Sequence, residues 1–293
     1  MPNDASYPST TITRNGPGVA TAREEHSDLL MTESPKGLYT SRIIKAGALL
    51  ADTTTLLDKW DESQSPADNL ARLQGENIFG KASRSRNNDI LAIFRQRYLQ
   101  DESITKALVY LVKNRFPKPA LDRILFFHSA QADRLLHDVV TEVLTDFYVR
   151  GRTEIRVEDI QSMLRTWVRE GKTTARWSDY TTRRVAQGLL ATLRDFNVLQ
   201  GATNKRLAPP HLPVSAFAYI AFCLRAKQAS GERLVETEEW RLFFLSTNDV
   251  ERLFMEGHQR RLLEYYAAGP VIRITFPSES LEEYARVISE REI

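Results

Sequence analysis

A basic stretch between residues 172 and 206 holds the side chains with the clearest capacity for chemistry. Arginine can pair with guanine through two hydrogen bonds in the major groove, and glutamine can do so with adenine. Residues 148–208 carry 12 basic and 6 acidic side chains, a local charge of +6 within a chain whose total is +2. Such an excess is typical of a surface that binds phosphates. The candidate DNA contacts are Lys172, Arg176, Tyr180, Thr181, Arg183, Arg184, Gln187, Lys205 and Arg206.

Five predicted elements would position these side chains. A strand-like run, TEIRV, precedes a helix over 158–170 that Gly171 closes. After a turn come a second helix, over 178–196, and the hairpin VLQGATNKRLAPP. Strand, helix, turn, helix and hairpin is the order of a winged helix-turn-helix, whose second helix often enters a DNA groove.

The second helix divides into two faces when its residues are placed 100° apart. The predicted core face holds Val185, Ala186, Leu189, Leu190, Leu193 and Phe196. The predicted exposed face holds Tyr180, Thr181, Arg184, Gln187, Gly188 and Ala191, with Arg183 and Arg194 at its border. We expect Gly188 and Ala191, being small, to let the helix backbone come close to DNA. The helix start would bind phosphate.

The basic surface has other interpretations. It could dock on an acidic neighbour, such as residues 209–293, which carry 10 basic and 13 acidic side chains. Winged helices also bind proteins. An uncharged, aromatic-rich face would favour that use, and the face predicted here is of another kind.

Motifs for catalysis are missing from the sequence. GENIFGKAS, residues 75–83, resembles a phosphate-binding P-loop, but Ala82 replaces the hydroxyl that binds magnesium, and the preceding segment is predicted to be helical rather than a strand. None of the five histidines forms an H-E-x-x-H pair or a Cys/His cluster. His137 is expected to pair with Asp133 on a helix surface. We therefore expect neither an enzyme, nor a cofactor, nor a metal site.

The chain of 293 residues is long enough for two or three small domains. A single cysteine, Cys223, excludes an intramolecular disulfide framework and fits a reducing cytosol. We expect its thiol to be buried and inert. The longest uncharged stretch, 209–224, has three prolines and is too short to span a bilayer, so a cytoplasmic protein is expected.

The fold class is predicted to be mainly α. We expect a disordered tail over 1–37, an all-α domain over 38–149, the winged segment over 150–210, and an α+β region over 211–293 with one or two strands. Predicted helices of the all-α domain cover 40–60, a segment from Ser65 to Gly80, a segment after SRSRNND, 101–116, 120–127 and 132–148. Those of the C-terminal region lie near 214–228, 236–245 and 247–266, then comes a strand, VIRITF, and a last helix capped by Ser278.

Two segments carry a family resemblance: YTSRIIKAGALLADTTTLLDKWD and ENIFGKASRSRNNDILAIFRQRYL. Their most specific pieces are SRIIKAGAL, GKASRSR and FRQRYL. The chain resembles, over roughly 38–210, the BrxA family of bacteriophage-exclusion (BREX) defence systems. The resemblance implies a non-catalytic, DNA-binding component with a NusB-like helical part, working beside a methyltransferase, an ATPase and a phosphatase-like protein.

The NusB-like comparison raises RNA binding as an alternative. Lys81, Arg84 and Arg86 precede or open a predicted helix, where side chains and free N–H groups suit a phosphate backbone. They form a possible second contact for nucleic acid or for a partner protein, or they form salt bridges within the domain. A protein-interaction adaptor within the defence complex is the other alternative.

Overall fold

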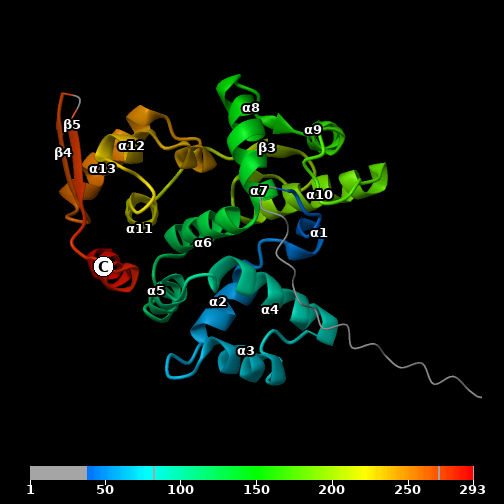
Figure 1. The fold of residues 1–293 in the computed structure, drawn as a ribbon, viewed down its shortest axis with the longest axis horizontal. Coiled ribbons are helices and arrows are strands. Elements are labelled where there is room, and N and C mark those ends of the chain that lie inside the picture. The colour runs from blue at the N-terminus through cyan, green and yellow to red at the C-terminus, as the bar shows by residue number, and fades with distance from the viewer. Residues whose placement is uncertain (1–37, 82, 270, 293) are drawn as a thin grey trace, which may run out of the picture. The chain divides into compact units, whose positions relative to one another are not determined.

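The computed structural model describes residues 38–81, 83–269 and 271–292 (Figure 1). This part of the chain is mainly helical, as the sequence predicts, and it has two small antiparallel sheets. The tail predicted over 1–37 lies outside the described residues. No helix in the described part is long and apolar enough to cross a membrane.

The N-terminal helices begin and end at capping residues and at left-handed backbone positions. The first five are α1 (Ile43–Ala46), α2 (Leu50–Asp58), α3 (Pro66–Gly75), α4 (Arg84–Tyr98) and α5 (Glu102–Lys113). The single helix predicted over 40–60 is wrong, because Gly47 (φ 59°) and Leu49 (φ 54°) interrupt it. Ser65 caps α3 as predicted, accepting a hydrogen bond from the Asp68 amide, but α3 ends at Gly75 rather than Gly80.

The next helical stretch is longer than predicted at one end and interrupted at the other. It comprises α6 (Lys118–Ala132), α7 (Arg134–Asp138), a π-helical turn η1 (Val139–Leu144) and α8 (Thr145–Val149). The helix predicted over 120–127 continues to Ala132, because the residues after Phe127 are also buried. Asp133 then separates two helices by capping α7 through the amides of Leu135 and Leu136.

A three-stranded sheet and two helices make up the middle of the chain. They are β1 (Glu154–Ile155), α9 (Val157–Arg169), α10 (Asp179–Asp195), β2 (Leu199–Gln200) and β3 (Lys205–Leu207). The sheet has the antiparallel order β1-β3-β2. These elements follow one another in the order that the sequence predicts. All six residues of the predicted core face of α10 are buried.

The C-terminal region differs most from the sequence-based prediction. It contains α11 (Val214–Arg225), α12 (Gly231–Glu236), a 3-10 turn η2 (Glu238–Phe243), α13 (Thr247–Gln259), β4 (Glu264–Ala268), β5 (Val271–Thr275) and α14 (Leu281–Arg291). The helix predicted over 247–266 is too long, because Arg261 is left-handed (φ 61°) and β4 follows to pair with β5. Ser280, not Ser278, caps the last helix.

The buried apolar side chains form one cluster that runs from Tyr39 to Ile288. α14 packs on α5, and α11 packs on α6. His128 on α6 lies 3.0 Å from the hydroxyl of Tyr219 on α11, and burial lowers the pKa of this histidine to about 3. The C-terminal region therefore shares a core with the N-terminal helices.

Candidate nucleic-acid interface

The predicted recognition helix α10 is anchored at its start and along one face. The Ser178 hydroxyl accepts a hydrogen bond from the Thr181 amide at 3.2 Å and so caps the helix. Arg165 of α9 forms an ion pair with Asp179 at 2.9 Å. With its apolar face buried, α10 leaves part of its remaining face exposed.

Most of the predicted contacts on α10 are available to a ligand. Tyr180 is 74% exposed, and Arg183, Arg184 and Gln187 are also exposed. Neither arginine forms an ion pair with any residue that the structure describes. Thr181 is only half-exposed, and its hydroxyl lies 3.0 Å from that of Ser178.

The other predicted contacts fall into two groups. Lys172 forms an ion pair with Glu170 at 3.0 Å, and Lys205 donates to the Ala202 carbonyl at 2.9 Å. Arg176 and Arg206 are exposed, without an acidic partner in the described chain. Lys172 thus has an acidic partner, whereas Lys205 is hydrogen-bonded without being neutralised and Arg176 and Arg206 have no acidic partner among the described residues.

Gly188, one of the two small residues predicted to face DNA, faces another part of the chain instead. A Cβ atom placed on Gly188 would lie 3.0 Å from the Ile43 carbonyl oxygen and 3.3 Å from the Ile44 Cα. Helix α1 therefore occupies the place beside Gly188 where we expected DNA. The close approach that a glycine permits is used to pack α1, and the expectation about Gly188 is corrected.

Hydrogen bonds fix α1 to both neighbouring parts of the fold. The Tyr39 amide donates to the Lys172 carbonyl at 2.7 Å, next to the turn before α10. On the other side Arg86 donates to the Lys45 carbonyl at 2.8 Å, and Arg97 donates to the carbonyls of Gly47 and Ala48. Residues 39–48 thus connect the start of α4 to α10.

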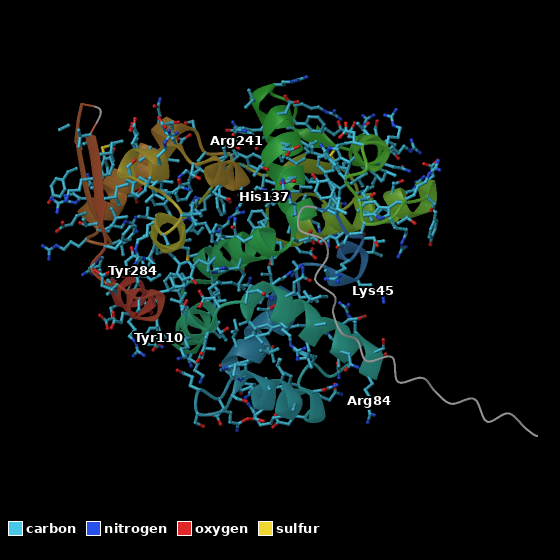
Figure 2. All side chains as sticks on the ribbon, viewed as in Figure 1. Lys45, Arg84, Tyr110, His137, Arg241 and Tyr284 are labelled. Atoms are coloured by element: carbon cyan, nitrogen blue, oxygen red, sulfur yellow. The ribbon has the colours of Figure 1, made fainter. Side chains whose placement is uncertain are left out.

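The three cations of the second predicted cluster, Lys81, Arg84 and Arg86, have different surroundings in the structure. Lys81 forms an ion pair with Asp52 at 3.1 Å, and the Arg86 guanidinium is engaged with α1. Arg84 is exposed and has no ion pair with a described residue. Figure 2 labels Arg84 at the start of α4 and Lys45 on α1. Of this cluster, Arg84 is the cation best placed to meet a ligand.

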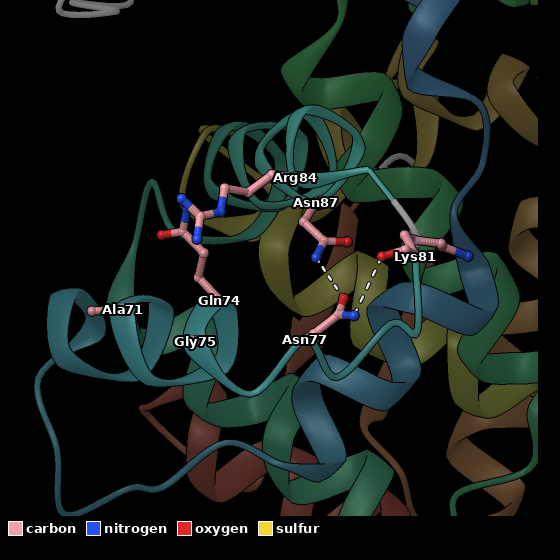
Figure 3. A pocket seen from close by; sticks show the side chains of 7 residues that line it. All are labelled: Ala71, Gln74, Gly75, Asn77, Lys81, Arg84 and Asn87. Carbon is pink, nitrogen blue, oxygen red and sulfur yellow. Dashed lines mark hydrogen bonds between the residues drawn. The ribbon is translucent and has the colours of Figure 1, made fainter.

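A hollow of about 520 Å³ lies between α3 and the start of α4 (Figure 3). Inside it the side-chain nitrogen of Asn77 donates to the Lys81 carbonyl at 3.3 Å, and the side-chain oxygen of Asn77 accepts from the Asn87 side chain at 2.6 Å. The lining residues are Ala71, Gln74, Gly75, Asn77, Lys81, Arg84 and Asn87. The segment before Gly75 is helix α3, so the strand that a P-loop needs is replaced by a helix, as predicted.

A comparison with models of protein families identifies the family of this chain. Residues 37–223 match the model of the BrxA family. The chain belongs to the BrxA family. Members of this family are components of BREX phage-defence systems, as the resemblance implies. No curated protein matches the chain.

A polar network joins the BrxA-matched part to the region beyond it. His137 lies 2.8 Å from Asp138 and 3.3 Å from Glu239, which is outside the matched residues. Asp138 also accepts hydrogen bonds from the Tyr39 hydroxyl at 2.8 Å and from Arg134 at 3.0 Å. The predicted surface pair between His137 and Asp133 is therefore wrong.

The network fixes the charges of its members. Hydrogen bonds to Asp138 and Glu239 raise the pKa of His137 to about 9, so the imidazole is protonated at neutral pH. Burial opposes ionisation of Asp138, but hydrogen bonds from His137 and Arg134 outweigh it and hold its pKa below the usual value. Sequence reasoning missed this network because Tyr39 and Glu239 are each about one hundred residues from the His137–Asp138 pair.

Two other expectations about reactive groups concern Cys223 and metals. Burial raises the pKa of the Cys223 thiol to about 12, which disfavours the reactive thiolate. The residue as a whole is half-buried rather than fully buried. Within residues 38–81, 83–269 and 271–292, no three His, Cys, Asp or Glu side chains gather as metal ligands would.

Proposed function

We propose that this BREX component binds duplex DNA, without catalysing a reaction, through a winged helix-turn-helix formed by residues 150–210. The part of α10 before Gly188, which α1 leaves open, would enter the major groove, with Arg184 and Gln187 facing base edges and Arg183 at the border of the helix. The β2–β3 hairpin would act as the wing and bring Arg206 to the backbone. Arg176, in the turn before α10, would meet a phosphate.

The distribution of ion pairs in this segment carries the proposal. Residues 148–208 hold 12 basic side chains. Six of them pair with acids: Arg150, Arg152, Arg156, Arg165, Lys172 and Arg194. Of the six that form no such pair with a described residue, Arg169 lies on α9, and the others are predicted contacts on the turn, α10 and the wing: Arg176, Arg183, Arg184, Lys205 and Arg206. The net positive charge is thus concentrated where a groove-binding helix needs it.

The physical consequence is a salt-dependent affinity. Each phosphate neutralised releases counterions, so the logarithm of the binding constant falls with the logarithm of salt with a slope of about −0.9 per contact on duplex DNA. Base contacts add discrimination of about 1–3 kcal/mol for each good bidentate pair.

Binding to labelled duplex DNA, single-stranded DNA and RNA across a salt series tests the proposal. We expect preference for the duplex and a steep salt slope. The double variant R183A/R184A should bind the duplex more weakly with unchanged thermal stability. A matched control is R233A/R273A, which removes two exposed arginines that, like Arg183 and Arg184, form no ion pair with a described residue. A folded R183A/R184A variant with wild-type affinity would refute the assignment of α10.

One observation favours protein docking as a second function. A hollow of about 430 Å³ between α8 and the η2–α13 segment is lined by Tyr148, Val149, Trp240 and Phe244 among others. Val149 is 77% exposed and Tyr148 is 40% exposed. An adaptor that uses this surface would co-purify with a partner and associate with little dependence on salt. Preference for RNA in the binding panel would instead support the NusB-like alternative.

A further inference from the structure

Helix α1 carries two exposed cations that the proposed winged segment does not include. They are Arg42 and Lys45, and neither forms an ion pair with a residue in the described part of the chain. α1 lies between α10 and α4 (Figure 1). It packs against Gly188 on one side and accepts the hydrogen bond of Arg86 on the other. The helix that carries Lys45 and directly follows Arg42 therefore lies between the proposed recognition helix and α4, at whose start Arg84 lies.

We infer that Arg42 and Lys45 extend the DNA-binding surface of α10 to Arg84, so that one duplex contacts α10, α1 and the start of α4. This inference rests on the proposed function and specifies how long a duplex the protein covers. It also gives the second basic cluster a role: Arg84 would contact the backbone of the same DNA rather than a separate RNA or partner.

The dimensions agree with a single continuous contact. Packed helices lie about 8–10 Å apart, so α10 and α4 on either side of α1 are separated by roughly 20 Å. With one base-pair step for about every 3.4 Å of a DNA strand, this adds roughly six base pairs to the contact made by α10.

The surface is also fixed before DNA arrives. Arg86 and Arg97 hold the carbonyls at the end of α1, and Gly188 lets the helix backbone sit against α10. Cations on a rigid element lose less conformational freedom on binding than cations on a flexible chain. Lys81, in contrast, is neutralised by Asp52, so the surface ends at Arg84.

Binding of the full chain to duplexes of increasing length tests the inference. For the wild type we expect affinity to rise with length until the duplex reaches α4. The triple variant R42A/K45A/R84A should reach its maximal affinity on duplexes about six base pairs shorter, and its salt slope should be smaller by roughly 0.9 for each contact removed. R233A, which removes an exposed arginine on α12, serves as the charge control. Thermal melting establishes that each variant is folded.

The outcomes separate this inference from the proposed function. If R183A/R184A weakens binding while the triple variant keeps the wild-type length profile and salt slope, the extended surface is refuted and the proposed function stands. If neither variant changes duplex binding, both are refuted. Should the triple variant alone lose affinity, the single surface through α10 is also refuted. Loss in both variants, with the shortened length profile in the triple variant, supports the inference.

Discussion

Two groups of charged side chains in this molecule differ in whether their cations have partners within the chain. On α10, Arg183 and Arg184 are exposed and form no ion pair with a described residue. In the network around Asp138, Arg134 and His137 are held by a carboxylate whose side chain is 5% exposed. An arginine that already has a buried partner stabilises the fold, whereas one without a partner can bind a ligand. The comparison separates residues that hold the protein together from residues that we propose bind DNA.

The largest expected effect comes from removing the carboxylate of the buried network. D138A leaves the Tyr39 hydroxyl, Arg134 and His137 without their shared acceptor. Breaking a buried charged pair typically costs about 3–5 kcal/mol of the free energy of unfolding. Urea denaturation should show a loss of about 3 kcal/mol, with duplex affinity unchanged in the remaining folded protein. D138N, which keeps an acceptor oxygen, should lose less. A D138A variant as stable as the wild type would contradict the structural role of the network.

The same network predicts how stability depends on pH. The pKa of His137 is about 9 in the folded protein and 6.5 as its ordinary value, so the folded state binds this proton more tightly. The stabilisation is complete below about pH 6.5 and is lost as pH rises through 9. By linkage it amounts to at most about 3 kcal/mol. The pKa values of Asp138 and Glu239 are lowered in the folded protein. These two carboxylates therefore stabilise the fold at pH values above their ordinary pKa, and this contribution is lost as the pH falls.

Melting temperatures measured between pH 5 and 9.5 check this prediction. Wild-type protein should be most stable near pH 5–6.5 and should weaken towards pH 9. H137Q should show a flatter alkaline limb, because the titrating imidazole is gone. If both proteins have the same profile above pH 6.5, His137 does not couple protonation to folding.

Gly188 determines how closely α1 can pack on α10. A leucine there must displace the Ile43 backbone, which a Cβ already meets at 3.0 Å. Overpacking of this kind costs about 1–3 kcal/mol. We expect G188L to lose about 2 kcal/mol of unfolding free energy in urea and also to weaken duplex binding by displacing the α1 cations.

The matched control for this change is G188A. Its methyl group is tight against α1, but alanine gains up to about 1 kcal/mol of helix propensity over glycine. Stability should therefore stay near the wild-type value. If G188L binds and melts like G188A, α1 does not depend on the close contact at residue 188.

The sequence predicted the parts of the fold that depend on local pattern. The core face of α10 has the helical period, and all six of its predicted residues are buried. Ser65 and Pro66 start α3 as helix-start signals predict. In contrast, the break between α1 and α2 includes Leu49 at φ 54°, which is unusual for a bulky apolar residue, and its one local signal is Gly47 two residues earlier.

Long-range contacts were beyond prediction from periodicity. Gly188 looks like an exposed small residue on the helical wheel, yet Ile43, 145 positions away in the sequence, covers it. Glu239 is 102 residues from His137, so helical spacing indicated Asp133, four residues before His137, as the partner instead. The order of elements in 150–210 could be predicted because each is local, but the packing of α1 on α10 could not.

The smallest expected effect compares two cations of the predicted site itself. Lys172 has its acidic partner Glu170 at 3.0 Å and a second contact with the Trp167 ring, whereas Arg176 is exposed without such a partner in the described chain. If partners within the chain decide which cations bind DNA, R176A should lower the duplex salt slope by about 0.9, as expected for one phosphate contact, and K172A should lower it by much less. Neither variant should change stability by more than about 0.5 kcal/mol, because both side chains are on the surface. Equal slopes for R176A and K172A would mean that the ion pair with Glu170 opens when DNA binds, since exposed pairs are worth only about 0–1 kcal/mol. The distinction between paired and unpaired cations would then hold only for buried partners such as Asp138.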